Sequence, residues 1–369
     1  MKRKTPLLDY NLLLPVLLLI IVSIVNLYSA TMGMQGKANG VSPLFYKQLL
    51  WFFIGTVALF VFASIDYRML KKLSMVLYGA TILLIMITIV KGRTAYGAQR
   101  WLSLGFFSFQ PSELAKFALL LVLANYFDEH WIENGYTIGS LLAPIIMILI
   151  PFLLIIKQPD LGTAIIILLI GASIILFSGV KLRTFLLFLV AFVTILPLGW
   201  HFMKGYQKTR LVAFVDPYKD PLGSGYHLLQ SRIAVGSGKL FGVGYLKGTQ
   251  SHLNFLPESH TDFIFSVLAE EWGFAGCVVV IALFAFILFE GLRISRYAKD
   301  RFGVVLAFGI TISIFLQFFI NIGMSTGILP VVGITLPFMS YGGTSVLMFM
   351  IEIGILLSIY IRKFRFEEM

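Results

Sequence analysis

Long apolar runs alternate with short polar segments along most of this chain. The first run, LLLPVLLLIIVSIVNLYSA, holds no charged residue. A run of about 20 such residues crosses a bilayer as a helix, because a helix satisfies its own backbone hydrogen bonds in lipid. The pattern predicts ten spans, at residues 10–31, 46–65, 73–91, 111–127, 141–157, 160–178, 184–203, 262–291, 302–323 and 340–361. We therefore expect an all-α polytopic membrane protein with about ten transmembrane helices.

The composition supports this class. Hydrophobic residues make up 58% of the 369 residues, charged residues only 13%, and the mean hydropathy is +0.90. A soluble domain of this size could not bury that much apolar surface. Neither a repeat nor a low-complexity tract is evident, so residues 1–369 are expected to form one membrane domain. The one long connection, residues 204–261, separates spans 7 and 8 and is expected to be functional or disordered.

Basic residues predict the orientation. Lys and Arg gather at the N-terminus, in the connections after spans 2, 6 and 8, and after span 10: Lys2, Arg3, Lys4, Arg68, Lys71, Lys72, Lys181, Arg183, Arg293, Arg296, Lys299, Arg301, Arg362, Lys363 and Arg365. The short loops opposite carry fewer. The positive-inside rule places both termini in the cytoplasm and the long loop outside. The net charge of +11 then indicates anionic lipid rather than nucleic acid.

Ionisable residues cluster where spans enter from outside. Glu113 and Lys116 lie in the first turns of span 4, Asp160 opens span 6, and Asp262 opens span 8. Such groups cost several kcal/mol in lipid unless they pair or meet water. Their shared depth predicts a polar cavity that faces outward.

Each of these residues also has a purely structural interpretation. Asp262 could complete a capping box that starts at Ser259. Glu113 and Lys116 are three residues apart on one helix face and can pair, and Asp160 could join them as a structural triad. The functional alternative is that Lys116 reaches a phosphate, as could Arg100 in the outer loop GAQRW.

Other polar residues give weaker signals. Glu258 and His260 are explained equally by a loop, and a metal site formed with His252 matches no strong spacing, so no metal ligand is predicted. Glu270 and Glu271, two to three turns inside span 8, suit hydrogen bonds between helices in protonated form.

Two glycine-rich segments are also informative. RIAVGSGKLFGVGYLKGTQ fails as a Walker A loop because Ile233 and Leu240 stand where Gly and Ser or Thr are required. Just before it, Tyr226, Leu229 and Ile233 predict a short helix on the membrane surface. GILPVVGITLPFMSYGGTS predicts a re-entrant or broken segment, because irregular backbone at membrane depth must pack on protein or line a cavity.

Several motifs together resemble the SEDS family (shape, elongation, division, sporulation). They are FQPSELAKFAL, KQPDLGTA, LPESHTDFIFSVLAEEWGF and NIGMSTGILPVVGITLPFMSYGGTS, in that order and spread over most of the chain. GYLKGTQSHLNFLPE is more similar to members that act in cell elongation than to those that act in division. One departure is His252, where the family pattern leads us to expect Gln.

The resemblance implies a peptidoglycan glycosyltransferase of the bacterial plasma membrane with lipid II, a disaccharide-pentapeptide on undecaprenyl diphosphate, as substrate. It places the family's essential acid on Asp262 and further polar site residues on Glu113, Lys116 and Asp160. The partners it implies are a class B penicillin-binding transpeptidase and other membrane proteins of the elongation machinery.

The implied chemistry suits these residues. A sugar hydroxyl is a weak nucleophile, and Asp262 could act as its base. The diphosphate leaving group needs cations, for which Lys116, Arg100 and Lys239 are candidates, and Glu258 joins the expected substrate-binding residues. An α-linked donor that becomes a β-linked glycan implies inversion in a single displacement. No cofactor is certain, although Mg²⁺ or Mn²⁺ could assist the diphosphate.

Two rival functions fit the same features. A polar cavity among ten spans also suits a transporter or flippase of lipid-linked precursors, although carriers often need polar groups near the midplane. A non-catalytic scaffold of the elongation machinery is the third interpretation.

Overall fold

The computed structural model describes residues 9–32, 42–95, 98–103, 108–203, 205–221 and 223–363. Within these ranges a helix coincides with each expected span: α1 (Tyr10–Met32), α2 (Pro43–Ser64), α3 (Tyr67–Lys91), α4 (Pro111–Glu129), α5 (Ile138–Lys157), α6 (Leu161–Phe177), α7 (Leu182–Phe202), α11 (Ile264–Tyr297), α12 (Arg301–Thr326) and α13 (Gly343–Arg362). The predicted all-α fold of a multi-pass membrane protein is confirmed.

Seven of these helices are long and apolar enough to span a membrane by length and composition: α1, α2, α3, α5, α11, α12 and α13. The apolar helix α6 and the described apolar part of α7 are shorter. α4 differs because Glu113, Lys116, Asp128 and Glu129 place charges near both of its ends. Its middle, from Leu119 to Ala124, is completely buried, so α4 faces other helices on every side.

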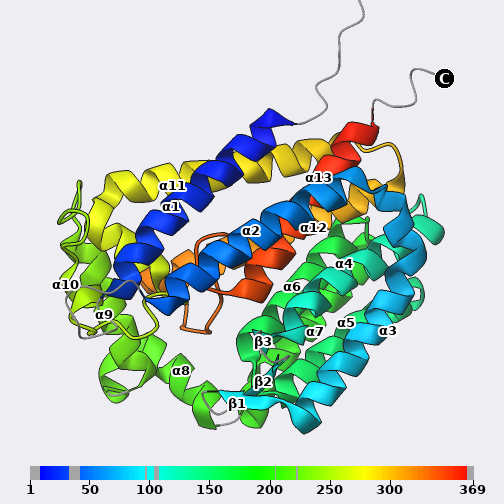
Figure 1. Ribbon diagram of the computed structural model, residues 1–369. Helices are drawn as coiled ribbons and strands as arrows, with labels where there is room; N and C mark the ends of the chain where they lie inside the picture. The colour runs from blue at the N-terminus through cyan, green and yellow to red at the C-terminus, as the bar shows by residue number, and fades with distance from the viewer. Residues whose placement is uncertain are drawn as a thin grey trace, which may run out of the picture.

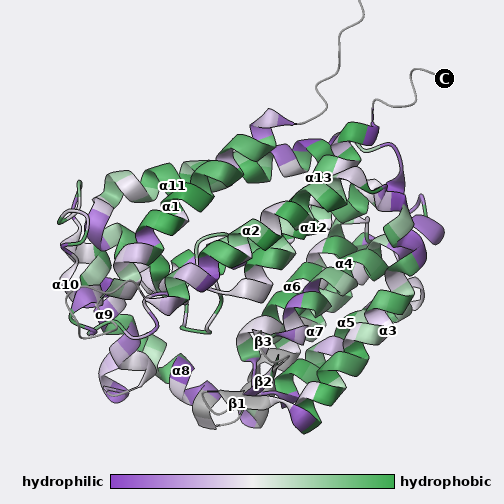
Figure 2. Ribbon diagram, in the orientation of Figure 1, coloured by the Kyte–Doolittle hydropathy of each residue, from purple (hydrophilic) through white to green (hydrophobic). Residues whose placement is uncertain are grey.

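The helices lie side by side, with the start of α1 and the end of α13 at one end of the bundle (Figure 1). The smaller elements of the connection between α7 and α11 lie at the opposite end, and apolar residues dominate the lengths of the helices between them (Figure 2). This arrangement has the parity that the positive-inside rule predicts. Close helix contacts depend on small residues: a Cβ on Gly354 of α13 would lie 2.4 Å from the carbonyl oxygen of Leu59 in α2.

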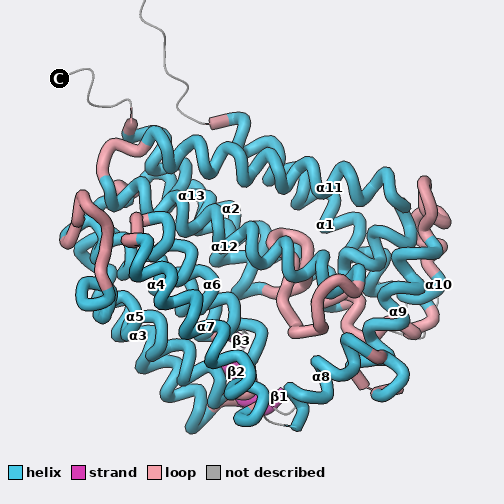
Figure 3. The backbone as a smooth tube through the Cα atoms, turned by 180° about the vertical axis from the view of Figure 1, so that it is seen from behind, coloured by secondary structure: helices cyan, strands magenta, loops and turns pink. Residues whose placement is uncertain are grey.

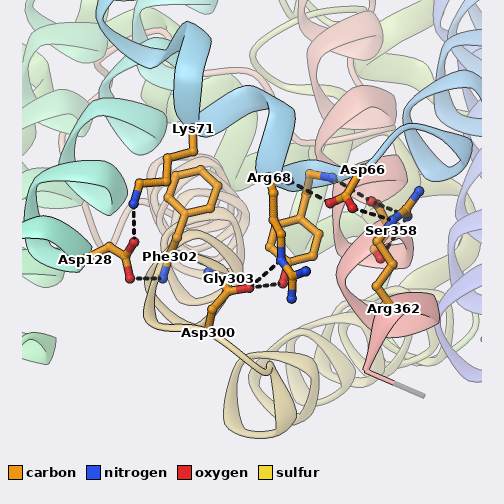
Figure 4. Close-up of polar contacts among 10 residues, drawn as sticks. Asp66, Arg68, Lys71, Asp128, Asp300, Phe302, Gly303, Ser358 and Arg362 are labelled. Carbon is orange, nitrogen blue, oxygen red and sulfur yellow. Dashed lines mark hydrogen bonds and ion pairs between the residues drawn. The ribbon is translucent and has the colours of Figure 1, made fainter. Parts of the chain in front are cut away.

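The end that carries the termini is tied together by charged side chains (Figure 4). Asp300 accepts hydrogen bonds from Arg68 Nε at 2.9 Å and, as the N-cap of α12, from the Gly303 N–H at 2.7 Å. Asp128, at the end of α4, accepts from Lys71 Nζ at 2.6 Å and from the Phe302 N–H at 3.1 Å. These bonds fix α3 and α4 to the start of α12.

The long connection is largely helical rather than irregular. It contains α8 (Gly205–Val215), a 3₁₀ turn η2 (Pro217–Lys219), α9 (Ser224–Ser237) and α10 (Thr249–His252). α9 is the helix expected from Tyr226, Leu229 and Ile233, but its most buried face is a different one. Ser231 on that face contacts Ser266 Oγ of α11 at 2.7 Å and donates to the Ser325 carbonyl of α12 at 2.6 Å, so α9 is anchored to the bundle.

A small antiparallel sheet lies between α3 and α4, which the sequence did not predict. Its strands are β1 (Arg93–Ala95), β2 (Ala98–Ser103) and β3 (Ser108–Phe109), paired in the order β1-β2-β3. The sheet carries Arg100 on its central strand, at the end of the bundle where α4 begins.

α11 is broken at Gly273, which corrects the prediction of one continuous span. Gly273 has φ +65° and ψ −164°, a conformation outside the helical region that glycine adopts readily. The break leaves backbone groups without helical partners, and residues 238–244 supply them. Val243 and Gly244 donate to the carbonyls of Glu270 and Glu271 at 3.0 and 3.1 Å. Phe274 N–H donates to the Lys239 carbonyl at 2.9 Å.

The segment from Gly327 to Gly342 between α12 and α13 is non-helical, as predicted, and packs on protein (Figure 3). Asn321 Nδ2 donates to the Ile334 carbonyl at 2.6 Å. Ser23 Oγ and Gln48 Nε2 donate to carbonyls of the same segment, Met339 at 3.1 Å and Ser340 at 3.2 Å. Side chains from three helices therefore satisfy backbone groups that lipid could not.

Candidate functional site

Asp262 lies immediately before α11 and faces the non-helical segment. Its backbone carbonyl accepts a hydrogen bond from Asn321 Nδ2 at 2.9 Å, and a Cβ on Gly333 would lie 3.3 Å from its Oδ2. Phe263 is the N-cap of α11 and makes no side-chain cap. The capping-box interpretation of Asp262 is therefore wrong, and the half-buried residue makes no side-chain cap at the helix start.

The surroundings of Asp262 alter its proton affinity. Burial of the carboxyl, and then the negative charge of Glu258, raise the pKa of Asp262 to about 7. Arg210 and Arg100 oppose this shift, and Asp160 adds to it. A carboxyl with a pKa near the working pH can both accept and release a proton there, which is what general base catalysis requires.

Asp160 is fixed by the start of its own helix. Its carboxylate caps α6 by accepting from Thr163 N–H at 3.2 Å and from Thr163 Oγ1 at 3.0 Å. It also forms an ion pair with Arg100 Nη1 at 3.7 Å, while Arg100 Nη2 donates to the Pro159 carbonyl. Asp160 is thus the partner of Arg100 on the sheet, and the structural triad considered with Glu113 and Lys116 does not form.

Glu113 and Lys116 form the expected pair, but at a deeper, buried position. Lys116 Nζ lies 2.8 Å from Glu113 Oε1 and donates to Gln317 Oε1 of α12 at 2.6 Å. It also stands 5.9 Å from the ring centroid of Phe349 on α13. The buried Glu352, one turn further along α13, interacts electrostatically with both members of the pair. These four polar residues join α4, α12 and α13.

The remaining candidates lie in different places. Glu258 Oε2 accepts from Thr261 Oγ1 at 2.9 Å within the turn before α11. The His260 ring lies tilted against Tyr341 with ring centroids 5.8 Å apart, and burial lowers the pKa of His260. Lys239 is exposed just after α9, and its carbonyl binds the backbone of Phe274 at the break in α11. Its role in substrate binding stays a prediction.

Glu270 and Glu271 bind other parts of the chain. Glu270 Oε1 accepts from the Thr249 N–H at 2.7 Å and so holds the start of α10. Glu271 Oε1 lies 3.3 Å from His252 Nε2 and accepts a hydrogen bond from Ser29 Oγ of α1. His252 is therefore engaged with Glu271, not with Glu258 and His260. In the described part of the chain, no three His, Cys, Asp or Glu residues are grouped to hold a metal ion.

Sequence reasoning missed four residues of these groups. Arg210 on α8 was lost in a connection treated as a loop. Gln317, Asn321 and Glu352 are buried inside spans. A polar side chain there is costly and indicates a partner or a functional site, so these three positions could have been found from the sequence.

The fold and the site geometry are those of a multi-pass helical membrane protein that gathers charged residues from separate elements at one end of its bundle. The model of the FtsW/RodA/SpoVE family, described as cell cycle protein, matches residues 10–364. The chain belongs to this family.

Individual relatives agree with this assignment. The peptidoglycan glycosyltransferase MrdB of Escherichia coli K12 is 40% identical over 357 residues, which covers 96% of this chain and 94% of MrdB. A chain from a solved peptidoglycan synthase complex, in which polymerization and crosslinking are coordinated, is 30% identical with a TM-score of 0.84, covering 97% of this chain and 99% of that one. The crystal structure of RodA from Thermus thermophilus is 28% identical with a TM-score of 0.71, covering 97% and 98%.

Proposed function

We propose that this chain is a peptidoglycan polymerase that joins lipid II disaccharides into glycan strands during cell elongation and releases undecaprenyl diphosphate. The glycosyltransferase activity follows from its family and from a curated peptidoglycan glycosyltransferase that is 40% identical over 96% of the chain. One observation carries the mechanism: the half-buried Asp262 has a carboxyl pKa raised to about 7, and the charges of Arg210 and Arg100 act on it.

Asp262 acts as the base toward the acceptor sugar. As the hydroxyl oxygen forms its bond to the anomeric carbon, the hydroxyl proton passes to the Asp262 carboxylate, and the anomeric carbon releases the diphosphate. Inversion needs one displacement only, so no second carboxylate serves as a nucleophile. Glu258 then has an indirect role, because its charge keeps the pKa of Asp262 high.

Arg100 and Arg210 bind the diphosphate. They come from β2 and α8, two elements far apart in the sequence, and both act electrostatically on Asp262. A guanidinium presents parallel donors that match phosphate oxygens, so two of them can hold the negative charge of the leaving group. Asp160 orients Arg100 through their ion pair.

Glu113 and Lys116 position the helices that carry the site. Their bonds to Gln317 fix α4 to α12, while the N–H of Gln110 before α4 lies 3.4 Å from Thr344 Oγ1 at the start of α13. The sheet that carries Arg100 leads directly into this held helix start. Lys239, and a divalent cation such as Mg²⁺ or Mn²⁺, stay predictions from the sequence.

The proposal places the protein in the bacterial plasma membrane with both termini in the cytoplasm. Asp262 and the residues that act on its charge (Glu258, Asp160, Arg100 and Arg210) form the Asp262 group. The connection between α11 and α12 lies at the end of the bundle where α1 begins and α13 ends, whereas β2, α8 and the start of α11, which carry or adjoin members of this group, lie at the other end (Figure 1). The positive-inside rule places the first end in the cytoplasm, and a lipid-borne sugar is available at the second. The similarity to a chain of a peptidoglycan synthase complex supports a class B penicillin-binding transpeptidase as partner, together with other elongation-machinery proteins.

The test uses the full chain purified with its transpeptidase partner and supplied with lipid II in detergent. We expect glycan ladders that fall at least about 100-fold in Asp262→Asn, since general bases contribute about 10²–10⁴-fold. Asp216→Asn is the matched control, because Asp216 is an exposed acid of the same outer connection.

Undiminished ladders in Asp262→Ala would refute the assigned base. Lipid translocation in liposomes without any polymerisation would indicate the transporter instead. If the unaltered protein showed neither polymerisation nor translocation, the scaffold would be the better explanation.

A further inference from the structure

A pocket of about 520 Å³ lies where α11 is broken, and Val22 of α1 is part of its lining. Most of its wall is apolar. Its lining comprises Val22, Phe241, Gly244, Tyr245, Leu268, Glu271, Trp272, Ala275, Gly276, Val279 and Val280. None of these residues belongs to the Asp262 group or to the Glu113 and Lys116 cluster.

The pocket contains a buried acid with spare hydrogen-bonding capacity. Glu271 is 2% exposed, and its Oε1 is used by Ser29 and His252. Within the described ranges its Oε2 has no hydrogen-bond partner, and neither has the buried Nε1 of Trp272. An unpaired buried carboxylate oxygen is costly, so a ligand that brings a hydrogen-bond donor would relieve this cost.

The depth of the pocket indicates where such a ligand comes from. Beyond Gly273, α11 continues from Phe274 to Tyr297, about 24 residues or about 36 Å, which is enough to cross about 30 Å of hydrocarbon. The break therefore lies at the lipid headgroup level. Trp272 and Tyr245 suit that level because amphipathic aromatic rings favour the interface.

A basic side chain, that of Lys247, borders the pocket. Lys247 is exposed, and its Cδ lies 3.3 Å from where a Cβ on Gly244 would be, so its side chain follows a lining residue. A cation thus borders the pocket while an acid lies inside it. Ala275, Val279 and Val280 continue from the acid toward the hydrocarbon as an aliphatic wall.

We propose that this pocket binds one phospholipid with a primary-amine headgroup. The ammonium group donates to Glu271 Oε2, the phosphate next to it meets Lys247 at the rim, and one acyl chain lies along Val279 and Val280. An anionic headgroup such as phosphatidylglycerol carries no ammonium group of its own to pair with Glu271. A choline headgroup is cationic but has no N–H to donate. The arrangement therefore selects for a zwitterion with donor protons.

The experiment is native mass spectrometry of the full chain in detergent with equal amounts of phosphatidylethanolamine, phosphatidylcholine and phosphatidylglycerol of identical acyl chains. We expect one retained phosphatidylethanolamine, preferred about 10-fold over phosphatidylcholine, as one charge-assisted hydrogen bond provides. Glu271→Gln should reduce this preference to about onefold.

Two tryptophan substitutions separate the pocket from the general lipid-facing surface. Val279→Trp fills the pocket and should abolish retention, whereas Val278→Trp changes an equally lipid-exposed neighbour outside the lining and should not. Ala275→Phe is a second filling variant, for use if Val279→Trp does not elute as a monodisperse species.

Three outcomes of the retention measurements would overturn the proposal. They are equal retention of phosphatidylcholine, preference for phosphatidylglycerol, and retention by both filling variants. Lipid that accumulates without saturating at one molecule would indicate annular binding only and would also overturn it.

Discussion

At the scale of single residues, Asp262 is set apart by what surrounds it. Asn321 holds its backbone, while Gly333 allows the carboxylate a close approach to the non-helical segment. Glu258 and Arg210 act on its charge in opposite directions. The carboxylate is therefore positioned by neutral contacts and tuned by charged ones, so the two effects can be altered separately.

Removing the charge of Glu258 should lower the pKa of Asp262 from about 7, because Glu258 is the largest cause of its elevation after burial. The base must be deprotonated, so the polymerisation rate rises with pH through about 7 and then levels off. In Glu258→Gln this rise should move to lower pH by about half a unit to one unit. Initial rates from pH 5 to 9 measure the shift. Glu133→Gln, an exposed acid at the opposite end, is the control; equal profiles for the two variants would contradict this electrostatic role.

The raised pKa also links Asp262 to stability. The folded protein holds this proton more tightly than the unfolded chain does, so the contribution of Asp262 to stability is full below about pH 4 and is lost as pH rises through about 7. Asp262→Asn removes the cost of a buried charge. Its melting temperature at pH 8 should exceed that of the parent protein, and the difference should shrink at pH 5. A difference that is independent of pH would argue against this linkage.

At the scale of elements, the break in α11 is stabilised by residues 238–244 of the preceding connection. Backbone groups of this segment replace helical partners on both sides of Gly273. The connection after α9 is thereby tied to the short part of α11 that starts beside Asp262. Glycine is required where the two backbones meet, because a Cβ on Gly242 would lie 2.0 Å from the Glu271 carbonyl oxygen.

Gly242→Ala should destabilise the protein by at least about 1–3 kcal/mol, since φ at this position is +79° and the new methyl meets backbone. Gly236→Ala is the matched control in the preceding helix, where a Cβ would meet nothing within 4 Å. Thermal unfolding in detergent should show a clear fall in melting temperature for the first variant and little change for the second. Similar melting temperatures would mean that the loop is not a structural part of α11.

At the scale of the whole molecule, the two ends of the bundle are built differently. The end with the termini is closed by ion pairs and helix caps among α3, α4, α12 and α13 (Figure 4). The opposite end carries the sheet, the connecting helices and the Asp262 group. Because the residues of the site come from distant parts of the chain, the helices that carry them must be held in fixed positions. The ion pairs and caps at the first end provide this. That residues 1–369 act as a single domain stays a prediction.

Asp300→Ala should destabilise the bundle by about 2–3 kcal/mol, because it removes the α12 cap and the acceptor for Tyr67 Oη at 2.5 Å. The exposed pair with Arg68 should add little. Asp216→Ala is the control, since Asp216 makes no side-chain cap. Melting curves compare the two variants, and equal shifts would show that the cluster does not hold this end together.

Local chemistry could be predicted from the sequence, whereas partners between helices could not. The Glu113 and Lys116 pair follows from their spacing on one helix, and Asp160 from its place at a helix start. The partner of Asp160 could not be predicted, because Arg100 lies on β2 and this strand is too short to give a periodic sequence signal. The break at Gly273 was hidden because its cause, residues 238–244, lies about 30 positions earlier in the chain.

The burial of α4 has a consequence for how the protein is made. Lys116 of α4 finds its acceptor on Gln317 only 201 positions later. At about 5–20 residues per second, the ribosome needs roughly 10–40 s to produce that partner. A helix with charges at both ends is poorly accepted by lipid on its own. The translocon must therefore retain α4, or neighbouring helices must shelter it, until α12 has been synthesised.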